Sequence, residues 1–402
     1  MQLSGTTATV LKLGTAQTLA WASTYYLSAI LAAPMARDLG VSVATVFAAF
    51  SVGLVITGFL GPRAGRAIDA LGGRPVLALS NGVFATGLLL LGLAQGPWGM
   101  FAAWIVIGIA MSGGLYEAAF ASLVRLYGRD SRSSITGITL IAGFASTVGW
   151  PLSTALEAWI GWRGTCFVWA GLHLLVAMPL NLWLPRAAAL ASPVAVVAVP
   201  AGGTPAAPPA EGDSRRSAVL FALVFAATGF VSTAMAAHLP TLLSASGVSL
   251  GMAVTAGALI GPAQVAGRLL EFGVLRSMHP LWSARLAAAL HPVGAVVLAI
   301  VGAPAAVMFA LLHGTGNGLL TIAKGTLPLV LFGPQGYGER QGRLMAPARW
   351  VQALAPWLFG LCVAHWGAGA LWLTAALGSV ALGALGRLSR SAHAEASKTN
   401  AG

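Results

Sequence analysis

Two opposite charges lie deep within apolar stretches of the sequence. Glu117 follows the run WGMFAAWIVIGIAMS, and Lys324 lies in LLTIAKGTLP. A charge near the middle of a bilayer costs a few kcal/mol or more, and it usually faces a cavity or a partner. Glu117 precedes Arg125 by eight residues and Lys324 precedes Gly333 by nine, so the charges lie roughly 12 and 13 Å along their helices from the loops that follow. We therefore expect them at similar depths in the membrane.

Polar side chains recur at helical spacing around these charges. Intervals of four, four and three residues put one stripe on a single helical face, made of His313, Asn317, Thr321 and Lys324. The first apolar run has a similar face, with Tyr25 beside it, made of Gln17, Trp21, Thr24 and Ser28. Such a face points to water or to a partner in a membrane helix. Aromatic rings mixed with amide and hydroxyl groups suit a small organic solute with a flat or carboxylated part.

The composition indicates that these stripes belong to a membrane protein. The chain has 402 residues, of which 57% are hydrophobic and only 8% are charged, against about 25% charged residues in soluble proteins. Apolar runs of about 20 residues recur along its length, and each can cross a hydrocarbon core of ~30 Å. We predict an all-α polytopic membrane protein. The two cysteines, Cys166 and Cys362, fall within apolar segments and are expected to be packing residues.

Turn signals divide the apolar runs into about twelve predicted spans in two pseudo-symmetric six-helix bundles. Their approximate cores are residues 9–32, 43–62, 75–95, 99–123, 135–157, 164–185, 218–243, 249–268, 283–302, 305–331, 344–366 and 368–387. The segment 186–217 is rich in Ala, Pro and Gly and predicts a flexible cytoplasmic linker. It separates an N-terminal bundle over 1–185 from a C-terminal bundle over 218–390, and a cytoplasmic tail is expected over 391–402.

Basic residues predict the orientation of the chain. The loops assigned to one side carry most of the arginines, Arg349 included, while the other side holds only Arg37 and Arg163. The excess of Lys and Arg in cytoplasmic loops puts the first side and both termini in the cytoplasm. The net charge of +12 is therefore a topology signal and does not indicate nucleic-acid binding. The first run is too long for a cleaved signal peptide and is expected to act as a signal anchor, in an inner or plasma membrane.

The loop between the second and third spans carries a family signature. It reads GPRAGRAIDALGGRPVL, in which the pattern is Gly65-Arg66-x-x-Asp69-x-x-Gly72-x-Arg74-Pro75. This pattern resembles the loop signature of the major facilitator superfamily, and the span count, linker and topology agree with it. The resemblance implies a conformational latch made of Gly65, Arg66, Asp69, Gly72 and Arg74. It also implies that Asp69 lies near the start of the eleventh span, where free helix amides favour an anion.

Two departures from the superfamily's drug/proton antiporters argue against that activity. Trp104, in WIVIG, stands where those proteins carry the Arg of an R-x-x-x-G pattern. The stretch GFASTVGWPLSTAL only approximates their G-x-x-x-G-P-x-x-G pattern, through Gly149 and Pro151.

The resemblance further implies a secondary transporter whose first, fourth, seventh and tenth spans line a central cavity. Glu117 and Lys324 lie on corresponding spans of the two halves, so we expect them to face each other across it. Two hypotheses follow. Glu117 is a proton-coupling acid, because burial favours its neutral form while Lys324 favours the carboxylate, and alternating access changes both. Alternatively, Lys324 binds the carboxylate of an organic anion that is taken up or exchanged, and Glu117 pairs with Lys324 when the site is empty.

Less specific interpretations of the same residues stay open. Glu117 and Lys324 can form a purely structural ion pair, His313 can bond a neighbouring helix, and Tyr25 can belong to the interfacial aromatic belt. A non-transporting receptor or scaffold has no soluble domain to support it. No metal-ligand cluster, nucleophile–base arrangement or G-x-x-x-x-G-K-[ST] motif occurs in the sequence, so we expect no enzyme, cofactor or metal. The expected partners are a small organic solute, protons and the lipid bilayer, and the chain is expected to be a monomer.

Overall fold

The computed structural model describes residues 5–186 and 211–388 of the chain, and within these ranges the regular elements are helices, with no strand. The first half contains α1 Gly5–Ala22, α2 Tyr25–Asp38, α3 Val43–Leu71, α4 Gly73–Leu93, α5 Pro97–Gly114, α6 Tyr116–Tyr127, α7 Arg132–Ala142, α8 Ala145–Leu172 and α9 Met178–Leu182. The second half contains α10 Glu211–Ala245, α11 Leu250–Gly273, α12 Pro280–Val301, α13 Ala306–Phe332, α14 Tyr337–Trp366 and α15 Ala370–Arg387.

The all-helical membrane architecture predicted from the composition is confirmed. In the described part of the chain, eight helical stretches are long and apolar enough to cross a membrane, and two of them, 97–182 and 337–387, contain more than one helix. The count of twelve spans stays a prediction. Most of the predicted linker and the whole predicted tail lie outside the described residues, and α10 already begins at Glu211, inside the segment predicted as linker.

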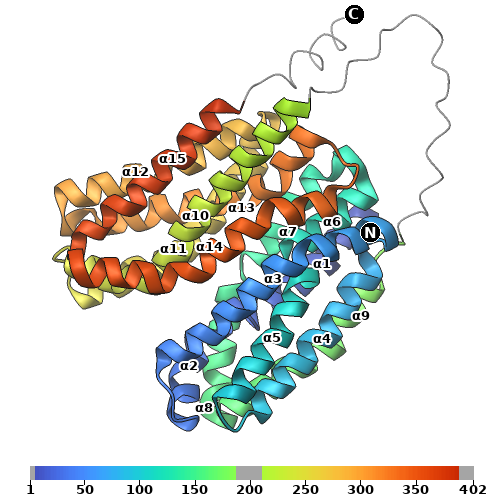
Figure 1. Ribbon diagram of the computed structural model, residues 1–402, viewed down its shortest axis with the longest axis horizontal. Coiled ribbons are helices and arrows are strands. Elements are labelled where there is room, and N and C mark those ends of the chain that lie inside the picture. Colours follow the sequence, from blue (N-terminus) through green and yellow to red (C-terminus); the bar gives the residue numbers. More distant parts are fainter. Residues whose placement is uncertain (1–4, 187–210, 389–402) are drawn as a thin grey trace, which may run out of the picture.

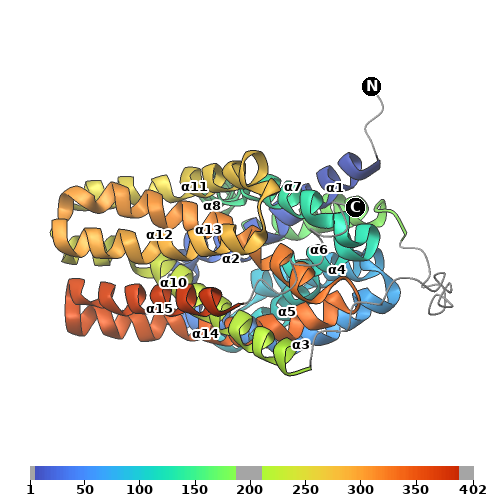
Figure 2. The ribbon, with the colours of Figure 1, turned by 90° about the horizontal axis from the view of Figure 1, so that it is seen from above.

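The two halves form separate helical bundles that meet along α3 and α14 (Figures 1 and 2). Contacts between α7 of the first half and both α11 and α13 of the second add a further interface. Figure 1 shows the bundles converging where α6, α7 and α13 lie and diverging toward α2 and α8 on one side and toward the far ends of α11 and α12 on the other. We call the converging end, where α3 ends and α14 begins, the latch end.

Three predicted spans are broken near their middles. The sequence predicts continuous helices over 9–32, 99–123 and 135–157, and this continuity is wrong. Ser23 and Thr24 interrupt the first, Leu115 the second, and Gly143 and Phe144 the third. The corresponding helices of the second half, α10, α13 and α14, are continuous.

The break at Leu115 is stabilised by a side chain from another helix. Leu115 has extended dihedrals of φ −95° and ψ −170°, which ends α5 and starts α6. Gln17 of α1 donates from Nε2 to the carbonyl oxygen of Gly114 at 2.7 Å. A backbone group freed by a break must be satisfied inside the protein, because hydrocarbon offers no partner. Tertiary contacts such as this one therefore decide where the span breaks.

The break between α1 and α2 lies against a buried histidine. His173 has no exposed surface and begins a π-helical turn, His173–Ala177. Its Nε2 lies 2.8 Å from Ser23 Oγ, and its Nδ1 lies 2.8 Å from Asn81 Oδ1. The ring also stacks on Phe84, with centroids 4.8 Å apart. The imidazole thus joins the break to α4.

Replacing His173 with leucine is expected to lower the melting temperature of the detergent-purified protein. The change leaves Asn81 Oδ1 without its partner in a buried site, and such an atom costs about 1–3 kcal/mol of unfolding free energy. Differential scanning fluorimetry measures the effect. His365→Leu, at an exposed position, is the matched control and should leave the melting temperature nearly unchanged. Equal melting temperatures for the two variants would show that the imidazole does not support the break.

Candidate functional site

The buried acid singled out in the sequence lies at the start of a half-helix. Glu117 is the second residue of α6 and belongs to its first turn. The free amides at a helix N-terminus favour a negative charge. The break at Leu115 therefore gives the Glu117 carboxylate an electrostatic partner in the backbone itself.

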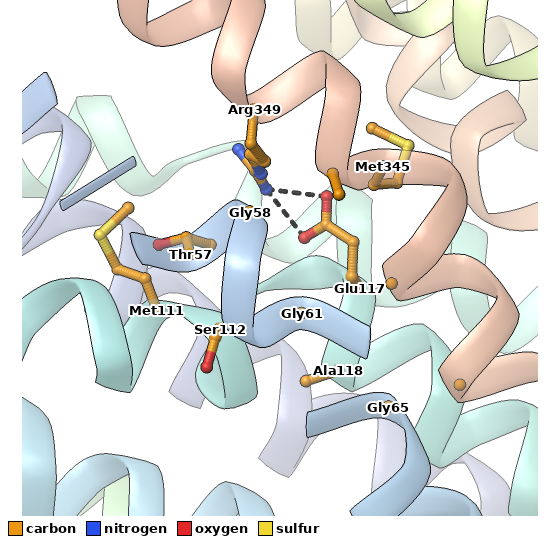
Figure 3. Close-up of a pocket in the computed structure, with 13 residues that line it drawn as sticks. Thr57, Gly58, Gly61, Gly65, Met111, Ser112, Glu117, Ala118, Met345 and Arg349 are labelled. Carbon is orange, nitrogen blue, oxygen red and sulfur yellow. Dashed lines mark hydrogen bonds and ion pairs between the residues drawn. The ribbon is translucent and has the colours of Figure 1, made fainter. Parts of the chain in front are cut away.

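An arginine of the second half binds this carboxylate. Nη2 of Arg349, in α14, donates to both oxygens of Glu117, at 2.7 Å to Oε1 and 2.8 Å to Oε2 (Figure 3). The Arg349 side chain is only 3% exposed. The contact joins the start of α6 in the first half to the inner part of α14 in the second half.

Arg349 is predicted to lie in a cytoplasmic loop, and this prediction is wrong. Because α14 begins at Tyr337 and not near 344, Arg349 lies twelve residues inside the helix, roughly 18 Å from its start. A usable signal was the spacing of four between Gly338, Gly342 and Ala346, since small residues at that spacing are typical of a packed membrane helix.

Lys324 approaches the same acid from α13. Its Nζ lies 3.4 Å from Glu117 Oε1, and both side chains are 15% exposed. The structure thus brings the two predicted charges together, with Arg349 as a third member that donates at shorter distances. We call Glu117, Lys324 and Arg349 the charge cluster. It holds two basic groups and one acid.

Aromatic rings of the first half adjoin the charge cluster. Nη1 of Arg349 donates to the hydroxyl of Tyr25, whose ring centroid lies 4.6 Å from that of Trp21 and 5.2 Å from that of Phe50. Trp21 in turn lies 4.8 Å from the ring of Tyr116. Trp21 and Tyr25 keep part of their surface uncovered, whereas Tyr116 is buried. We call Trp21, Tyr25, Phe50 and Tyr116 the aromatic wall.

Trp104 lies behind this wall. Its side chain is 1% exposed, and its ring packs against Phe50 with centroids 5.1 Å apart. The position that resembles the arginine site of drug/proton antiporters is therefore filled by a buried aromatic ring.

Other predicted site residues make contacts within their own half. Thr24 Oγ1 donates to Ala20 O at 2.7 Å, beside the break in the first span. Thr321 Oγ1 donates to Asn317 O at 2.8 Å. His313 is buried, and its Nδ1 lies 2.9 Å from Nδ1 of His291 in α12. His313 therefore contacts a neighbouring helix, which is one of the two interpretations that the sequence left open.

Glycines let α3 and α14 approach closely below the charge cluster. A small pocket lies beside this contact, where α3, α5, α6 and α14 meet, and is lined by Thr57, Gly58, Gly61, Gly65, Met111, Ser112, Glu117, Ala118, Gly338, Gly342, Met345, Ala346 and Arg349 (Figure 3). A Cβ atom at Gly65 would overlap the carbonyl oxygen of Gly338. A Cβ atom at Gly342 would lie 2.5 Å from the carbonyl carbon of Gly61. Such close approach requires glycine.

The latch residues lie where these two helices meet. Asp69 Oδ1 accepts the amide of Gly338, and Oδ2 accepts the amide of Glu339, both at 2.9 Å. Arg66 Nε lies 3.7 Å from Glu339 Oε1. Asp69 thus caps the N-terminus of α14, the eleventh predicted span, with a carboxylate from the first half.

The two remaining latch residues contribute differently. Gly72 has a φ of +83° and separates α3 from α4, a backbone conformation that favours glycine. Arg74 is partly exposed in the first turn of α4, and it has no ion-pair partner in the described part of the chain.

A second contact joins the halves at the latch end. Nη2 of Arg132, at the start of α7, lies 2.8 Å from Glu271 Oε1, and Nη1 donates to Met278 O at 2.8 Å. Glu271 is buried near the end of α11 and also accepts from Ser283 Oγ at 2.5 Å. The sequence around Arg268 and Glu271 partly repeats the latch pattern, and the structure places Glu271 against the opposite half.

Replacing Asp69 with alanine is expected to loosen the first turn of α14. Loss of an N-terminal cap costs about 1 kcal/mol, which is roughly a fivefold change in an opening equilibrium. Amide hydrogen exchange of Gly338 and Glu339, followed by mass spectrometry, should accelerate by about that factor. Asp130→Ala, in an exposed turn, is the matched control. Unchanged exchange at both amides would contradict the capping role.

Comparisons with known proteins agree with this architecture. The model of the Major Facilitator Superfamily matches residues 13–329. One curated relative, an uncharacterized 38 kDa protein in the 23S RNA operon of Thermoproteus tenax, is 30% identical over 167 residues, which are 41% of this chain and 43% of that protein. The chain therefore matches less than half the length of this relative.

Solved structures share the fold at low sequence identity. The human organic anion transporter MFSD10 (TETRAN) is 19% identical, with a TM-score of 0.66 over 96% of this chain and 100% of that one. The transporter FucP in the outward conformation is 13% identical, with a TM-score of 0.70 over 95% and 98%. A further structure of FucP, the E. coli fucose:proton symporter, is 14% identical with a TM-score of 0.65 over 95% and 98%. The family model covers most of the chain, and the fold agrees with it over nearly the whole length: the chain belongs to the Major Facilitator Superfamily, and is a multi-pass membrane protein of the transporter class.

Proposed function

We propose that the chain is a secondary active transporter that moves a small organic solute by alternating access and couples this movement to protons through Glu117. The single observation that carries the proposal is the charge cluster. A carboxylate of one half lies between two basic side chains of the other half, so rocking of the halves changes its partners. A proton shifts the equilibrium between the outward-facing and inward-facing states only if it binds one of them more tightly than the other. A change of partners at Glu117 supplies this difference in proton affinity.

We place the protein in the inner or plasma membrane of the cell. The latch end then faces the cytoplasm. The basic loops of that end support this orientation, as does the sequence pattern that places both termini there. The halves meet at the latch end and diverge at the other (Figure 1), an arrangement that fits the outward-facing state. One chain supplies both halves of the site, so a monomer suffices.

Flux measurements test proton coupling. A solute selected by thermal shift of the purified protein is followed into proteoliposomes under an imposed pH gradient. The unmodified chain should accumulate the solute, and Glu117→Gln should transport without response to the gradient. A gradient response that survives in Glu117→Gln would rule out coupling at this residue.

A second candidate function is uptake or exchange of an organic anion at Lys324. The specific observation in its favour is that Arg349 adds a second basic group beside a single acid. One structural neighbour is itself described as an organic anion transporter. Under this function Lys324→Ala should abolish binding of the anion, and intact binding would remove the candidate.

A further inference from the structure

We propose that the transported solute is an aromatic monocarboxylate, and that Glu117 is an internal carboxylate which the solute replaces on Arg349 when Glu117 takes up a proton. The inference rests on the proposed function and names its substrate class. It follows from the charges of the cluster, from the way they are paired, and from the aromatic wall beside them.

The charge balance of the site favours an anion. Glu117 compensates one of the two basic groups, and Arg349 holds both of its oxygens at 2.7 and 2.8 Å. Lys324 reaches only Oε1, at 3.4 Å, and has no other acid partner within the described ranges. One positive charge is therefore left without an acid of its own. A cationic solute would meet net repulsion here, whereas an anionic solute would be attracted.

The pairing of Arg349 sets the condition for binding. Glu117 occupies the face of the guanidinium group that a solute carboxylate would use, since arginine binds carboxylates through directed N–H donors. Two carboxylates at one site repel each other, and the repulsion is relieved when one of them is protonated. A proton bound to Glu117 turns the acid into a neutral group, and the solute carboxylate then accepts the Arg349 hydrogen bonds in its place.

This exchange leaves the charge of the site unchanged. The empty cluster holds Arg349 and Lys324 as cations and Glu117 as an anion, and the loaded cluster holds the same cations, a neutral Glu117 and one solute anion. The proton comes from the water on the side to which the site is open and leaves with the solute on the other side. One proton therefore accompanies one monoanion, and transport is electroneutral.

The aromatic wall indicates what the carboxylate is attached to. Tyr25 accepts a hydrogen bond from Arg349, so its ring flanks the group that the carboxylate would bind. Trp21 packs against Tyr25 in a tilted arrangement and keeps part of its surface uncovered. Its Nε1 is buried without a hydrogen-bond partner. Partly uncovered ring faces beside a buried cation suit a flat aromatic body, which gains from offset or edge-to-face packing.

Calorimetry on the full-length purified protein tests the substrate class. The probes are benzoate, phenylacetate and 2-naphthoate. The control compounds are benzamide, which is neutral, benzylamine, which is cationic, acetate, which lacks a ring, and phthalate, which is a dianion. We expect the aromatic monocarboxylates to bind more tightly than every control compound. Titration in two buffers of different ionisation enthalpy should show about one proton taken up per anion bound, at a pH where Glu117 is ionised in the empty protein.

Variants separate the internal carboxylate from a merely structural acid. Glu117→Gln should bind benzoate at least as tightly as the unmodified chain, without proton uptake. Arg349→Gln should lose roughly 10- to 100-fold in affinity, whereas Arg129→Gln, at an exposed position, should lose none. Trp21→Leu should weaken binding of benzoate and leave that of acetate unchanged. Tighter binding of benzoate to Glu117→Gln is an effect that partial unfolding of the variant does not produce.

The outcomes distinguish this inference from the function on which it rests. If a neutral or cationic solute binds and is transported while the aromatic monocarboxylates do not bind, the substrate class is wrong and the transporter function stands. Equal binding of benzoate and benzamide, or benzoate binding without proton uptake, also overturns the inference. If no solute of any charge binds or is transported, the proposed function fails with it.

Discussion

Replacing Gly65 with alanine is expected to open the latch end of the molecule, whereas the same replacement at Gly61 should leave it closed. Both glycines lie in α3 and face α14. A Cβ atom at Gly65 would overlap the carbonyl oxygen of Gly338, while one at Gly61 would lie 3.6 Å from the carbonyl oxygen of Gly342, an ordinary contact. Backbone cannot move aside as a side chain can, and overpacking of this kind costs about 1–3 kcal/mol.

This cost falls on only one of the two states of an alternating-access cycle. The overlap exists while α3 and α14 are in contact and disappears when they separate. A penalty of about 1.4 kcal/mol changes the ratio of closed to open molecules tenfold. Gly65→Ala should therefore shift the population strongly without unfolding either bundle, and Gly61→Ala is a control on the same helix and the same interface.

Spin labels at the latch end measure the shift. Cysteines replace the exposed residues Arg129 and Arg387, one in each half, in a chain whose own Cys166 and Cys362 are alanine. The distance distribution from double electron–electron resonance should broaden to longer distances in Gly65→Ala and keep the parent distribution in Gly61→Ala. Identical distributions for the two variants would contradict the close approach of the helices.

The sequence alone predicts the parts of the site that depend on depth and motif. Glu117 and Lys324 can be paired because each stands alone in an apolar helix, at a countable distance from a loop. The resemblance implies the position of Asp69 because the loop signature is a compact pattern. These features are local, so spacing along the chain is sufficient to locate them.

The parts that depend on contacts between distant segments are missed. The break at Leu115 places Glu117 at a helix start, yet it depends on Gln17, which lies 97 residues away along the chain. Arg349 is mistaken for a loop charge because the start of α14 is fixed by its packing on α3 and by the Asp69 cap, not by local hydropathy. His313 shares a polar face with Lys324 but turns to His291, a partner that no spacing rule indicates.

The charge cluster leads to a specific order of stabilities. Glu117→Gln should lower the melting temperature more than Arg349→Gln, and Arg349→Gln more than Lys324→Gln. Without Glu117, two basic groups remain near each other and lack an acid, and an uncompensated buried charge costs about 3–5 kcal/mol. Without Arg349, Glu117 still has Lys324 as a partner. Without Lys324, the pair of Arg349 and Glu117, which has the shorter distances, remains intact.

Scanning fluorimetry on the three variants and on the double variant Glu117→Gln/Arg349→Gln measures this order. The double variant removes one charge of each sign, so it should recover stability relative to Glu117→Gln. A larger loss from Arg349→Gln than from Glu117→Gln would mean that the acid is not shared between the two cations. The double variant also separates a structural pair from a coupling site. If the pair is structural, restored stability should restore a flux that still responds to a pH gradient. If Glu117 carries the proton and Arg349 binds the solute, the stable double variant should show no gradient-driven flux.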